Sequence, residues 1–222
     1  MKKRALFPPV LVFALFATVV AAADPPSHAL HHPPMASSCE ECAPLHHPLR
    51  AEVGEPAPPF TLDAVVNKEF KTVSLADYRG KWVVLFFYPL DFTFVCPTEI
   101  KGFNATLDSF QKLNAVVLGA SVDSKWSHLA WIQRGDLGDL KYPLLSDITK
   151  ETAEKYGILD RKEGVALRGL FIIDPEGRLQ YMLVHNLSVG RSVDETLRVL
   201  EALQTGELCP VGWKPGMKTL GK

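Results

Sequence analysis

The four cysteines of this 222-residue chain carry its most reactive side chains. Cys96 follows an apolar run and a proline, Cys209 lies in a Gly- and Pro-rich segment near the C-terminus, and Cys39 and Cys42 form a Cys-x-x-Cys pair near the N-terminus. The thiolate is the nucleophilic form of cysteine, and an ordinary thiol titrates near about pH 8.5. The surroundings of each cysteine therefore decide whether it can do chemistry at neutral pH.

Cys96 lies where a predicted strand ends and a predicted helix begins. The apolar run WVVLFFY (82–88) breaks at Pro89, which stiffens the following loop, and helical spacing begins after Cys96. At a helix N-terminus, free backbone N–H groups and the helix dipole favour a thiolate. Thr93 can offer a hydroxyl to a molecule near the sulfur, and Glu99 can orient a guanidinium. These neighbours predict a reactive thiolate, whereas the alternative is a small buried apolar cysteine.

The segment FYPLDFTFVCPTEI (87–100) resembles the active-site segment of the typical two-cysteine peroxiredoxins, whose motif is Pro-x-x-x-Thr-x-x-Cys. Pro89, Thr93 and Cys96 match that motif. The likeness runs from about residue 53 to residue 217 and includes the stretches SVDS, HLAWI, YPLLSD, RGLFIID, VGRSVDETLR and CPVGWKPG. It implies a thioredoxin-like fold and a peroxidase that reduces hydrogen peroxide and organic hydroperoxides without metal or flavin.

The resemblance also implies a role for each matching residue. Cys96 would attack the terminal oxygen of a hydroperoxide, and Thr93 would hydrogen-bond the peroxide or the sulfur. Arg168 would favour the thiolate and polarise the O–O bond, with Glu99 and Arg191 as a supporting charge network. Donors aimed at the departing oxygen would lower the barrier, because attack moves negative charge onto that atom. Without the resemblance, the two arginines could equally be solvated surface residues.

Cys209 is the candidate for the second step of such a reaction. Attack on a peroxide leaves a sulfenic acid, with which a second thiol condenses to a disulfide. In the resembled family this resolving cysteine comes from the partner subunit. The resemblance therefore implies a head-to-tail homodimer, often assembled into rings, and a thioredoxin-like thiol reductant as electron donor. A structural cysteine in the tail is the alternative.

The N-terminal residues 1–23 have the pattern of a signal peptide. Positive charges at residues 2–4 precede an apolar segment, and AAA stands before Asp24. The pattern predicts cleavage after Ala23 and export to the periplasm or the medium. A retained membrane anchor is the alternative, which the short, proline-containing apolar run disfavours.

Residues 24–52 predict a flexible linker, because prolines, histidines and small residues leave no apolar period. Cys39 and Cys42 in this segment could bind zinc or copper, or form a local redox disulfide. An inert disulfide is the preferred interpretation in an oxidising compartment. The metal-binding interpretation rests on the histidines that flank this pair, which are His28, His31, His32, His46 and His47.

Length and composition predict one globular domain of ordinary type. The hydrophobic share is 47%, the charged share is 22%, and the net charge of −1 gives no basic surface for nucleic acid. The domain is predicted over 53–206 and the tail over 207–222. Strands alternate with helices and a late hairpin follows, which predicts an α/β domain with a mixed central sheet flanked by helices. Predicted strands cover 82–88, 115–122, 141–147 and 169–186, and predicted helices cover 97–113, 125–134, 149–157 and 192–206.

Three further expectations concern side chains on the predicted helices. Ser192 and Glu195 form a capping-box pattern at the start of the last helix. His128 is expected to pack between aromatic side chains rather than to act in catalysis. Trp126 and Trp131 are expected in helix packing or a subunit contact.

Two other function classes remain open from the residues. A thiol–disulfide oxidoreductase on the same fold would need a Cys-x-x-Cys at the strand–helix junction, but Glu99 occupies the second cysteine position. A binding protein, either a ring-forming holdase or a metal buffer that uses Cys39 and Cys42, belongs to a different class. Peroxide consumption lost on Cys96→Ser would separate the peroxidase from both.

Overall fold

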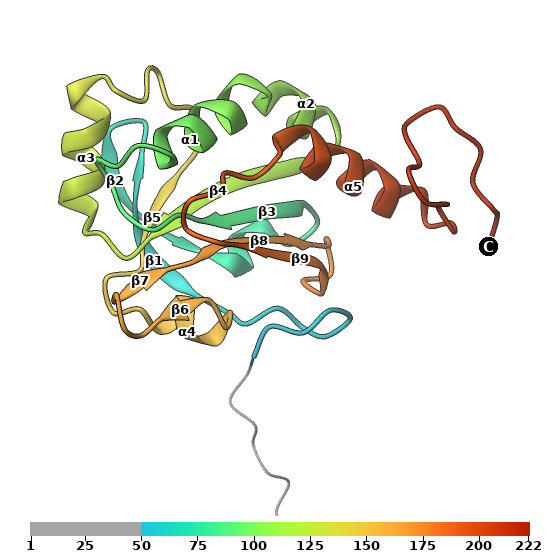
Figure 1. The fold of residues 1–222 in the computed structure, drawn as a ribbon, viewed down its shortest axis with the longest axis horizontal. Coiled ribbons are helices and arrows are strands. Elements are labelled where there is room, and N and C mark those ends of the chain that lie inside the picture. Colours follow the sequence, from blue (N-terminus) through green and yellow to red (C-terminus); the bar gives the residue numbers. More distant parts are fainter. Residues whose placement is uncertain (1–49) are drawn as a thin grey trace, which may run out of the picture. The chain divides into compact units, whose positions relative to one another are not determined.

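The computed structural model describes residues 50–222 (Figure 1). The predicted signal peptide, residues 24–49 of the predicted linker and the Cys39–Cys42 pair lie outside the described residues. Ala51, within the end of the predicted linker, is buried, and its N–H donates to the carbonyl of Lys155 at 3.0 Å. The packed domain therefore includes Ala51, which precedes the predicted domain start at Val53.

A mixed seven-stranded sheet lies at the centre of the described residues, in agreement with the predicted α/β class. Its strand order is β2-β1-β5-β4-β3-β8-β9. The pairs β3–β4 and β4–β5 are parallel, whereas β1–β2, β1–β5, β3–β8 and β8–β9 are antiparallel. The strands are β1 (Thr61–Val66), β2 (Glu69–Ser74), β3 (Trp82–Phe87), β4 (Ala115–Ser121), β5 (Leu144–Ser146), β8 (Arg168–Ile173) and β9 (Leu179–His185).

Helices cover both faces of this sheet (Figure 1). A separate two-stranded ribbon pairs β6 (Leu159–Asp160) with β7 (Val165–Ala166). The helices are α1 (Cys96–Ala105), α2 (Leu107–Lys112), α3 (Lys125–Arg134), α4 (Glu151–Lys155) and α5 (Val193–Thr205), with a 3₁₀ helix η1 (Leu75–Tyr78).

Strand β3 explains why the apolar run that precedes the site is nearly continuous. Alternate side chains of a strand point to opposite faces, and helices cover both faces here. Leu85 and Phe87 pack into the cluster that also contains α4 side chains, whereas Phe86 and Tyr88 pack with side chains of α1, α2 and α5. Cys96 belongs to this second cluster, so it lies on the α1 face of the sheet.

The β1–β2 hairpin is an element that the sequence analysis missed. Its two strands pair in full register, with Val66 opposite Glu69, around the two-residue turn Asn67–Lys68. Both turn residues have positive φ, 52° and 64°, which is the geometry of the tight turns that match strand twist. Strand β2 reads EFKTVS and is mostly exposed, so it has no clear apolar alternation to reveal it.

The single helix predicted over 97–113 is wrong in one respect, because α1 and α2 are separate helices. Thr106 lies between them, and its hydroxyl donates to the carbonyl of Gly102 at 3.0 Å. Such a bond to the preceding turn lets the side chain compete with the regular helix pattern. The start of α1 at Cys96 agrees with the predicted junction.

Helix α5 confirms half of the predicted capping box. The Ser192 hydroxyl accepts a hydrogen bond from the N–H of Glu195 at 3.1 Å. The Glu195 carboxylate binds Arg198 instead of the Ser192 backbone. Within residues 50–222, none of the helices is long and apolar enough to cross a bilayer.

Candidate active site

Cys96 is the first residue of α1, directly after the loop that leaves β3. Its side chain is fully buried, and Pro97 occupies the second helical position. Pro is favourable there, because the first N–H groups of a helix have no partner within it. The thiol thus lies at the positive end of the α1 dipole, where a thiolate is stabilised. This is the position that the sequence predicted.

Arg168 lies beside the sulfur and links it to a carboxylate. Its Nη1 lies 3.5 Å from Cys96 Sγ and donates to Glu99 Oε2 at 2.6 Å. Its Nε donates to the carbonyl of Leu187 at 2.8 Å, which fixes the plane of the guanidinium. The side chains of Arg168 and Glu99 are 4% and 2% exposed, so water screens their charges little.

Arg191 completes the charge network from the loop before α5. Its Nε donates to Glu99 Oε1 at 2.7 Å, and its backbone N–H donates to the same oxygen at 2.9 Å. Its Nη1 donates to the carbonyls of Phe87 and Gly169, at 2.8 and 2.5 Å. Arg191 therefore joins α1 to the ends of β3 and β8, and neither arginine is a solvated surface residue.

Glu99 holds two buried guanidinium groups with one carboxylate. Burial alone would raise the pKa of Glu99, but hydrogen bonds and charge attraction from Arg191, together with the Arg168 charge, keep that pKa below its ordinary value. Burial lowers the pKa of Arg191, against the opposing effect of Glu99. The site thus keeps a net positive charge near Cys96 while Glu99 is ionised.

Thr93 and Pro89 shape the loop before Cys96. Pro89 is buried, and the Thr93 hydroxyl donates to the carbonyl of Leu90 at 2.9 Å. Within the described residues, no hydrogen bond joins Thr93 to Cys96 in this conformation. Because the hydroxyl proton is used on Leu90, the lone pairs of the Thr93 oxygen are what it can offer to an incoming hydroperoxide.

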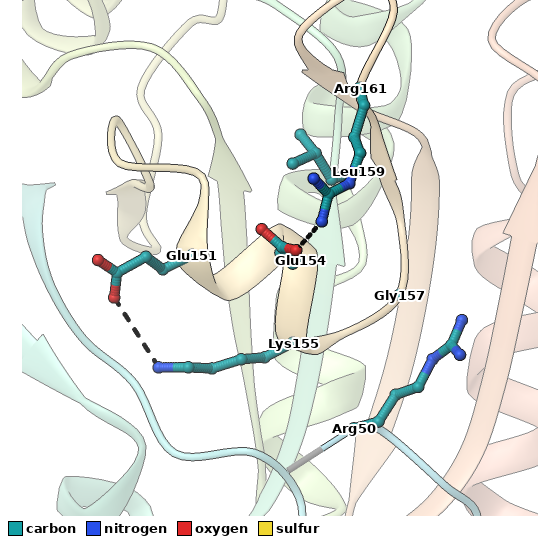
Figure 2. Close-up of a pocket in the computed structure, with 7 residues that line it drawn as sticks. All are labelled: Arg50, Glu151, Glu154, Lys155, Gly157, Leu159 and Arg161. Carbon is teal, nitrogen blue, oxygen red and sulfur yellow. Dashed lines mark hydrogen bonds and ion pairs between the residues drawn. The ribbon is translucent and has the colours of Figure 1, made fainter. Parts of the chain in front are cut away.

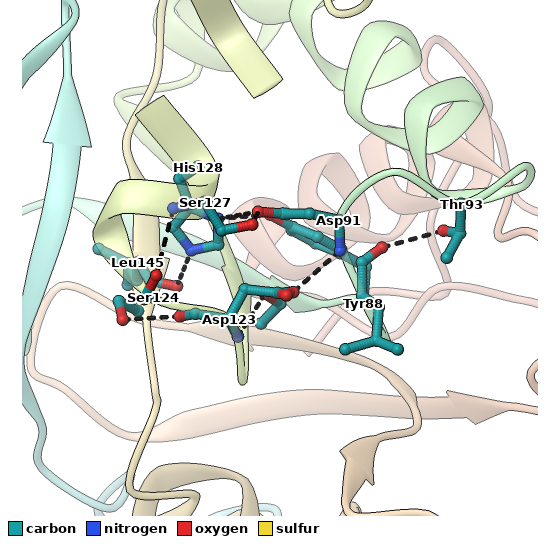
Figure 3. A network of polar contacts seen from close by, with 11 residues as sticks. Tyr88, Asp91, Thr93, Asp123, Ser124, Ser127, His128 and Leu145 are labelled. Atoms are coloured by element: carbon teal, nitrogen blue, oxygen red, sulfur yellow. Dashed lines mark hydrogen bonds and ion pairs between the residues drawn. The ribbon is translucent and has the colours of Figure 1, made fainter. Parts of the chain in front are cut away.

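A buried polar network that the sequence analysis did not identify supports the same loop (Figure 3). Asp91 accepts hydrogen bonds from Tyr88 Oη at 2.9 Å and Ser127 Oγ at 2.7 Å, and its Oδ2 lies 2.9 Å from His128 Nδ1. The other ring nitrogen of His128 lies 3.1 Å from the carbonyl of Leu145. Asp91 thereby ties the loop to α3 and to β5.

The surroundings of Tyr88 favour its protonated form, which donates the hydrogen bond to Asp91. Burial, and secondarily the Asp91 charge, raise the pKa of Tyr88 well above its usual value, so Tyr88 remains a donor. The backbone N–H of Asp91 donates to Asp123 Oδ2 at 2.9 Å. Burial and the Asp91 charge raise the pKa of Asp123. His128 is buried with Tyr88 as an aromatic neighbour, which agrees in part with the expected packing between aromatic side chains, and it also contacts the Asp91 carboxylate, which the expectation did not include.

Trp131 and Trp126 occupy different environments on α3. Trp131 is buried and packs near Tyr88 and Phe92, which agrees with helix packing. Trp126 is 65% exposed and packs edge-on against Phe70 of β2.

Within one chain, Cys209 and Cys96 lie at opposite ends of the domain. Gln204, in the last turn of α5, donates to the carbonyl of Leu113 at 2.7 Å, near the start of β3. Cys96 instead follows the end of β3, and six strand residues span roughly 20 Å. Figure 1 shows the C-terminal tail beyond the end of α5, opposite the start of α1. A disulfide needs Cα atoms within about 7 Å, so these two cysteines of one chain cannot join in this conformation.

A pocket of about 580 Å³ lies beside α4, on the other face of the sheet from Cys96 (Figure 2). Its charged side chains are largely paired with one another, through Glu151–Lys155 and Glu154–Arg161. Among residues 50–222, no group of three His, Cys, Asp or Glu side chains is placed to hold a metal ion. The pocket beside α4 is lined by Arg50, Glu151, Glu154, Lys155, Gly157, Leu159 and Arg161.

The mixed sheet, with a buried thiol at a helix N-terminus beside a fixed guanidinium, defines a thioredoxin-like thiol protein. Comparison with known families identifies the class further, because residues 53–182 match the AhpC/TSA family. The chain belongs to this family and is a typical 2-Cys peroxiredoxin. It is therefore a thiol-dependent peroxidase, an oxidoreductase.

Individual relatives agree over the same domain. The chain is similar to Peroxiredoxin-2 of Cricetulus griseus, with 57% identity over 77% of this chain and 90% of the relative. The reduced 2-Cys peroxiredoxin of Plasmodium vivax superimposes with a TM-score of 0.72 and 45% identity, over 75% of this chain and 91% of that one. The thioredoxin peroxidase I of Plasmodium yoelii gives a TM-score of 0.63 and 47% identity, over 72% and 98%.

Proposed function

We propose that Cys96 is the peroxidatic cysteine and Cys209 the resolving cysteine of a peroxidase that reduces hydrogen peroxide and organic hydroperoxides. The observation that carries this assignment is the position of Cys96 Sγ at the start of α1, 3.5 Å from Arg168 Nη1. Both features favour the thiolate, which is the form that attacks a peroxide.

In the first step, the Cys96 thiolate attacks the terminal oxygen of the hydroperoxide. A sulfur–oxygen bond forms while the oxygen–oxygen bond breaks, and the departing alkoxide or hydroxide leaves with that electron pair and takes up a proton. Negative charge moves from sulfur to the departing oxygen. Arg168 and the N–H groups at the start of α1 stabilise that charge, and Glu99 with Arg191 keeps Arg168 in place.

Thr93 and Pro89 act through the loop in this scheme. The Thr93 oxygen accepts a hydrogen bond from the O–H of the hydroperoxide, since the Thr93 hydroxyl proton is donated to the carbonyl of Leu90. Pro89 limits the backbone conformations available between β3 and Thr93. Together they place the peroxide in line with the sulfur.

In the second step, the Cys209 thiol of a partner subunit attacks the Cys96 sulfenic acid. A sulfur–sulfur bond forms, the sulfur–oxygen bond breaks, and hydroxide leaves as water with the thiol proton. The separation of roughly 20 Å along β3 within one chain supports an intersubunit bridge. Because Cys96 is fully buried, the first turn of α1 must unwind before this bond can close.

The proposed assembly is a head-to-tail homodimer that further associates into a ring. Strand β9 is an edge of the sheet, and its Met182 and Val184 side chains are 37% and 40% exposed. Phe92 and Phe94, in the loop before Cys96, are 46% and 95% exposed. Two separate apolar surfaces of this kind support two kinds of subunit contact. Sedimentation of the reduced protein should therefore give a species larger than a dimer.

A thioredoxin-like dithiol is the proposed electron donor. It supplies two electrons and two protons to the Cys96–Cys209 disulfide and becomes a disulfide itself. The similarity to a Plasmodium yoelii thioredoxin peroxidase supports this class of donor. A coupled assay with candidate dithiol reductants tests the proposal, and turnover with a monothiol pool alone would contradict it.

Export is the proposed destination, on the basis of the charged, apolar and small-residue pattern in residues 1–23. Cys39 and Cys42 are then expected to form a local disulfide or to bind a metal ion in the mature protein. N-terminal sequencing of the secreted protein is expected to begin at Asp24. A cytoplasmic product that retains Met1 would overturn the export proposal without affecting the peroxidase.

The cysteine roles are tested by peroxide treatment followed by non-reducing electrophoresis. The wild-type chain should give a covalent dimer, and both Cys96→Ser and Cys209→Ser should abolish it. Peroxide consumption in single turnover should be lost in Cys96→Ser but retained in Cys209→Ser. A Cys209→Ser variant that still forms a covalent dimer through Cys96 would overturn the assignment of the resolving cysteine.

A further inference from the structure

The C-terminal tail, predicted over 207–222 only as a Gly- and Pro-rich segment, forms a closed loop. Leu208 donates its N–H to the carbonyl of Gly221 at 2.9 Å, and Leu220 donates to the carbonyl of Leu208 at 2.8 Å. Between them, Trp213 Nε1 donates to the carbonyl of Met217 at 3.1 Å. The loop that contains Cys209 is therefore joined at its base and across its middle.

The apolar side chains of this loop are divided between exposed positions and one buried position. Leu208, Val211 and Leu220 are 62%, 102% and 71% exposed, whereas Trp213 is 4% exposed. A gap of about 450 Å³ lies between the loop and α5, with Arg198 and Cys209 in its lining. Trp213 therefore anchors the loop, and because the other three side chains are exposed, polar contacts also contribute to how often the loop opens.

Arg198 of α5 makes a polar contact that holds the middle of the loop on the helix. Its Nη1 donates to the carbonyl of Trp213 at 2.9 Å. Its Nε and Nη2 donate to the two carboxylate oxygens of Glu195, each at 2.7 Å. Such a bidentate pair fixes the plane of the guanidinium, so the third donor is aimed at Trp213 before the loop closes.

Closure of the loop holds Cys209 on the last turn of α5. Cys209 Sγ lies 3.5 Å from Thr205 Oγ1 and 3.8 Å from the carbonyl of Ala202. Cys209 stands four residues before Trp213, so the loop cannot leave Arg198 without releasing the segment that carries the sulfur. In the closed loop the Cys209 thiol is thus held against α5.

We propose that Arg198 is a positioning residue for Cys209, which holds the tail loop closed and thereby sets the rate of disulfide formation. This inference rests on the proposed function, because it concerns the second step only. Opening of the loop must precede attack on the sulfenic acid, whereas the reaction of Cys96 with peroxide does not involve the loop. Glu195 takes part indirectly, because it orients the Arg198 guanidinium.

The test separates the two steps in the full chain under single-turnover conditions with hydrogen peroxide. Rapid quenching with a thiol-blocking reagent and mass spectrometry follow the Cys96 sulfenic acid and the Cys96–Cys209 disulfide. In Arg198→Met, disulfide formation should be roughly two- to tenfold faster, which corresponds to loss of one hydrogen bond that resists opening. Glu195→Gln should give a smaller acceleration. Arg161→Met is the matched control, since Arg161 pairs with Glu154 and does not contact the loop.

Two independent readouts distinguish this role from a general structural one. Amide exchange at Leu208 and Leu220 should become faster in Arg198→Met, while exchange in β3 and β4 should not change. At high peroxide, the fraction of Cys96 oxidised to sulfinic acid should fall, because faster disulfide formation competes with a second peroxide.

The results distinguish a failure of the proposed function from a failure of the proposed role of Arg198. If Cys96 does not react with peroxide, the proposed function is wrong. If Cys96 reacts normally but disulfide formation in Arg198→Met and Glu195→Gln is unchanged or slower, the role of Arg198 is wrong. Arg198→Lys is a second variant, which retains the positive charge but loses the bidentate pair with Glu195, so disulfide formation should again be faster than in the wild type. A rate at or below the wild-type value, with slow exchange at Leu208, would mean that the charge suffices without the bidentate geometry and would contradict this part of the proposal.

Discussion

The guanidinium of Arg168 lies 3.5 Å from the sulfur of Cys96 and is held there by Glu99 and by the carbonyl of Leu187. Because these contacts exist before any substrate is present, the proposed role of Arg168 requires no reorganisation when charge moves during the reaction. The relationship connects residues 72 positions apart in the chain, through α1 on one side and the start of β8 on the other.

Replacement of this guanidinium should slow the first step. Arg168→Met is expected to reduce the rate of Cys96 oxidation by about a hundredfold or more, the usual loss when one preorganised donor is removed from a transition state. Arg168→Lys should recover part of the rate, since it keeps the charge but not the hydrogen bond to Leu187. Stopped-flow measurement with hydrogen peroxide checks the order wild type, Lys, Met. Equal rates for all three would contradict the role of Arg168.

Glu99→Gln should destabilise the protein, because it leaves two buried guanidinium groups without a counter-charge. Removal of one member of a buried charge pair typically costs about 3–5 kcal/mol. The loss is measured by urea unfolding at neutral pH. Arg198→Met is a suitable comparison, since it removes an ion pair at a partly exposed site.

The same variant has a defined pH dependence. The folded pKa of Glu99 lies below its ordinary value, so its contribution to stability is fully present above the unfolded pKa of about 4.3 and is lost as pH falls through the folded pKa. The stability difference between wild type and Glu99→Gln should therefore shrink on acidification below about pH 4.3. A difference that stays constant down to the acid transition would show that the Glu99 carboxylate is not stabilised in the folded state.

His128 and Asp91 should behave as a coupled pair that anchors the loop before Cys96. His128→Leu leaves the Asp91 carboxylate buried without one of its partners, which is expected to cost several kcal/mol. Asp91→Asn combined with His128→Leu should cost less than the sum of the single changes. A double-mutant cycle by urea unfolding measures this coupling, and amide exchange in residues 89–95 reports the loop. Additive energies would contradict the pairing.

Gly119→Ala should test the packing of the central strand. A Cβ at Gly119 would lie 2.9 Å from Leu144 Cδ2 and 2.9 Å from Phe86 Cζ, closer than real contacts allow. Overpacking of this kind costs about 1–3 kcal/mol. Gly135→Ala is not an equivalent control, since Gly135 has a φ of 89° and the strain there is in the backbone. Thermal unfolding should show a lower transition temperature for Gly119→Ala, and an unchanged one would contradict the tight contact.

The parts of the fold that were predicted correctly are those specified by local pattern. The apolar run of β3, the helical spacing after Cys96 and the turn in the β8–β9 hairpin are each contained within a short window of sequence. The β1–β2 hairpin was missed because β2 is polar on most positions and its turn has Asn67–Lys68 rather than a glycine. At the division of α1 from α2, the Thr106 hydroxyl donates to the preceding turn, a contact that hydrophobic periodicity does not reveal.

The candidate site shows the same division. Cys96 and its neighbours lie in one continuous motif, so their types and spacing could be interpreted directly. The Asp91–His128 contact spans 37 positions and exists only because α3 packs beside the loop. The contact of Arg198 with Trp213 depends on how the tail folds back on α5. A charged residue such as Asp91 in an otherwise apolar loop was the available signal for a buried polar partner.

The most direct test of the account is the rate at which hydrogen peroxide converts Cys96 to its sulfenic acid in the folded protein. Cys209→Ser isolates this step, and a dimedone-type reagent with mass spectrometry identifies the modified residue. We predict selective modification of Cys96 at a rate about a hundredfold or more above that of the same thiol in the urea-unfolded chain. A folded-state rate no greater than the unfolded-state rate would contradict the claim that the α1 terminus and Arg168 activate this sulfur.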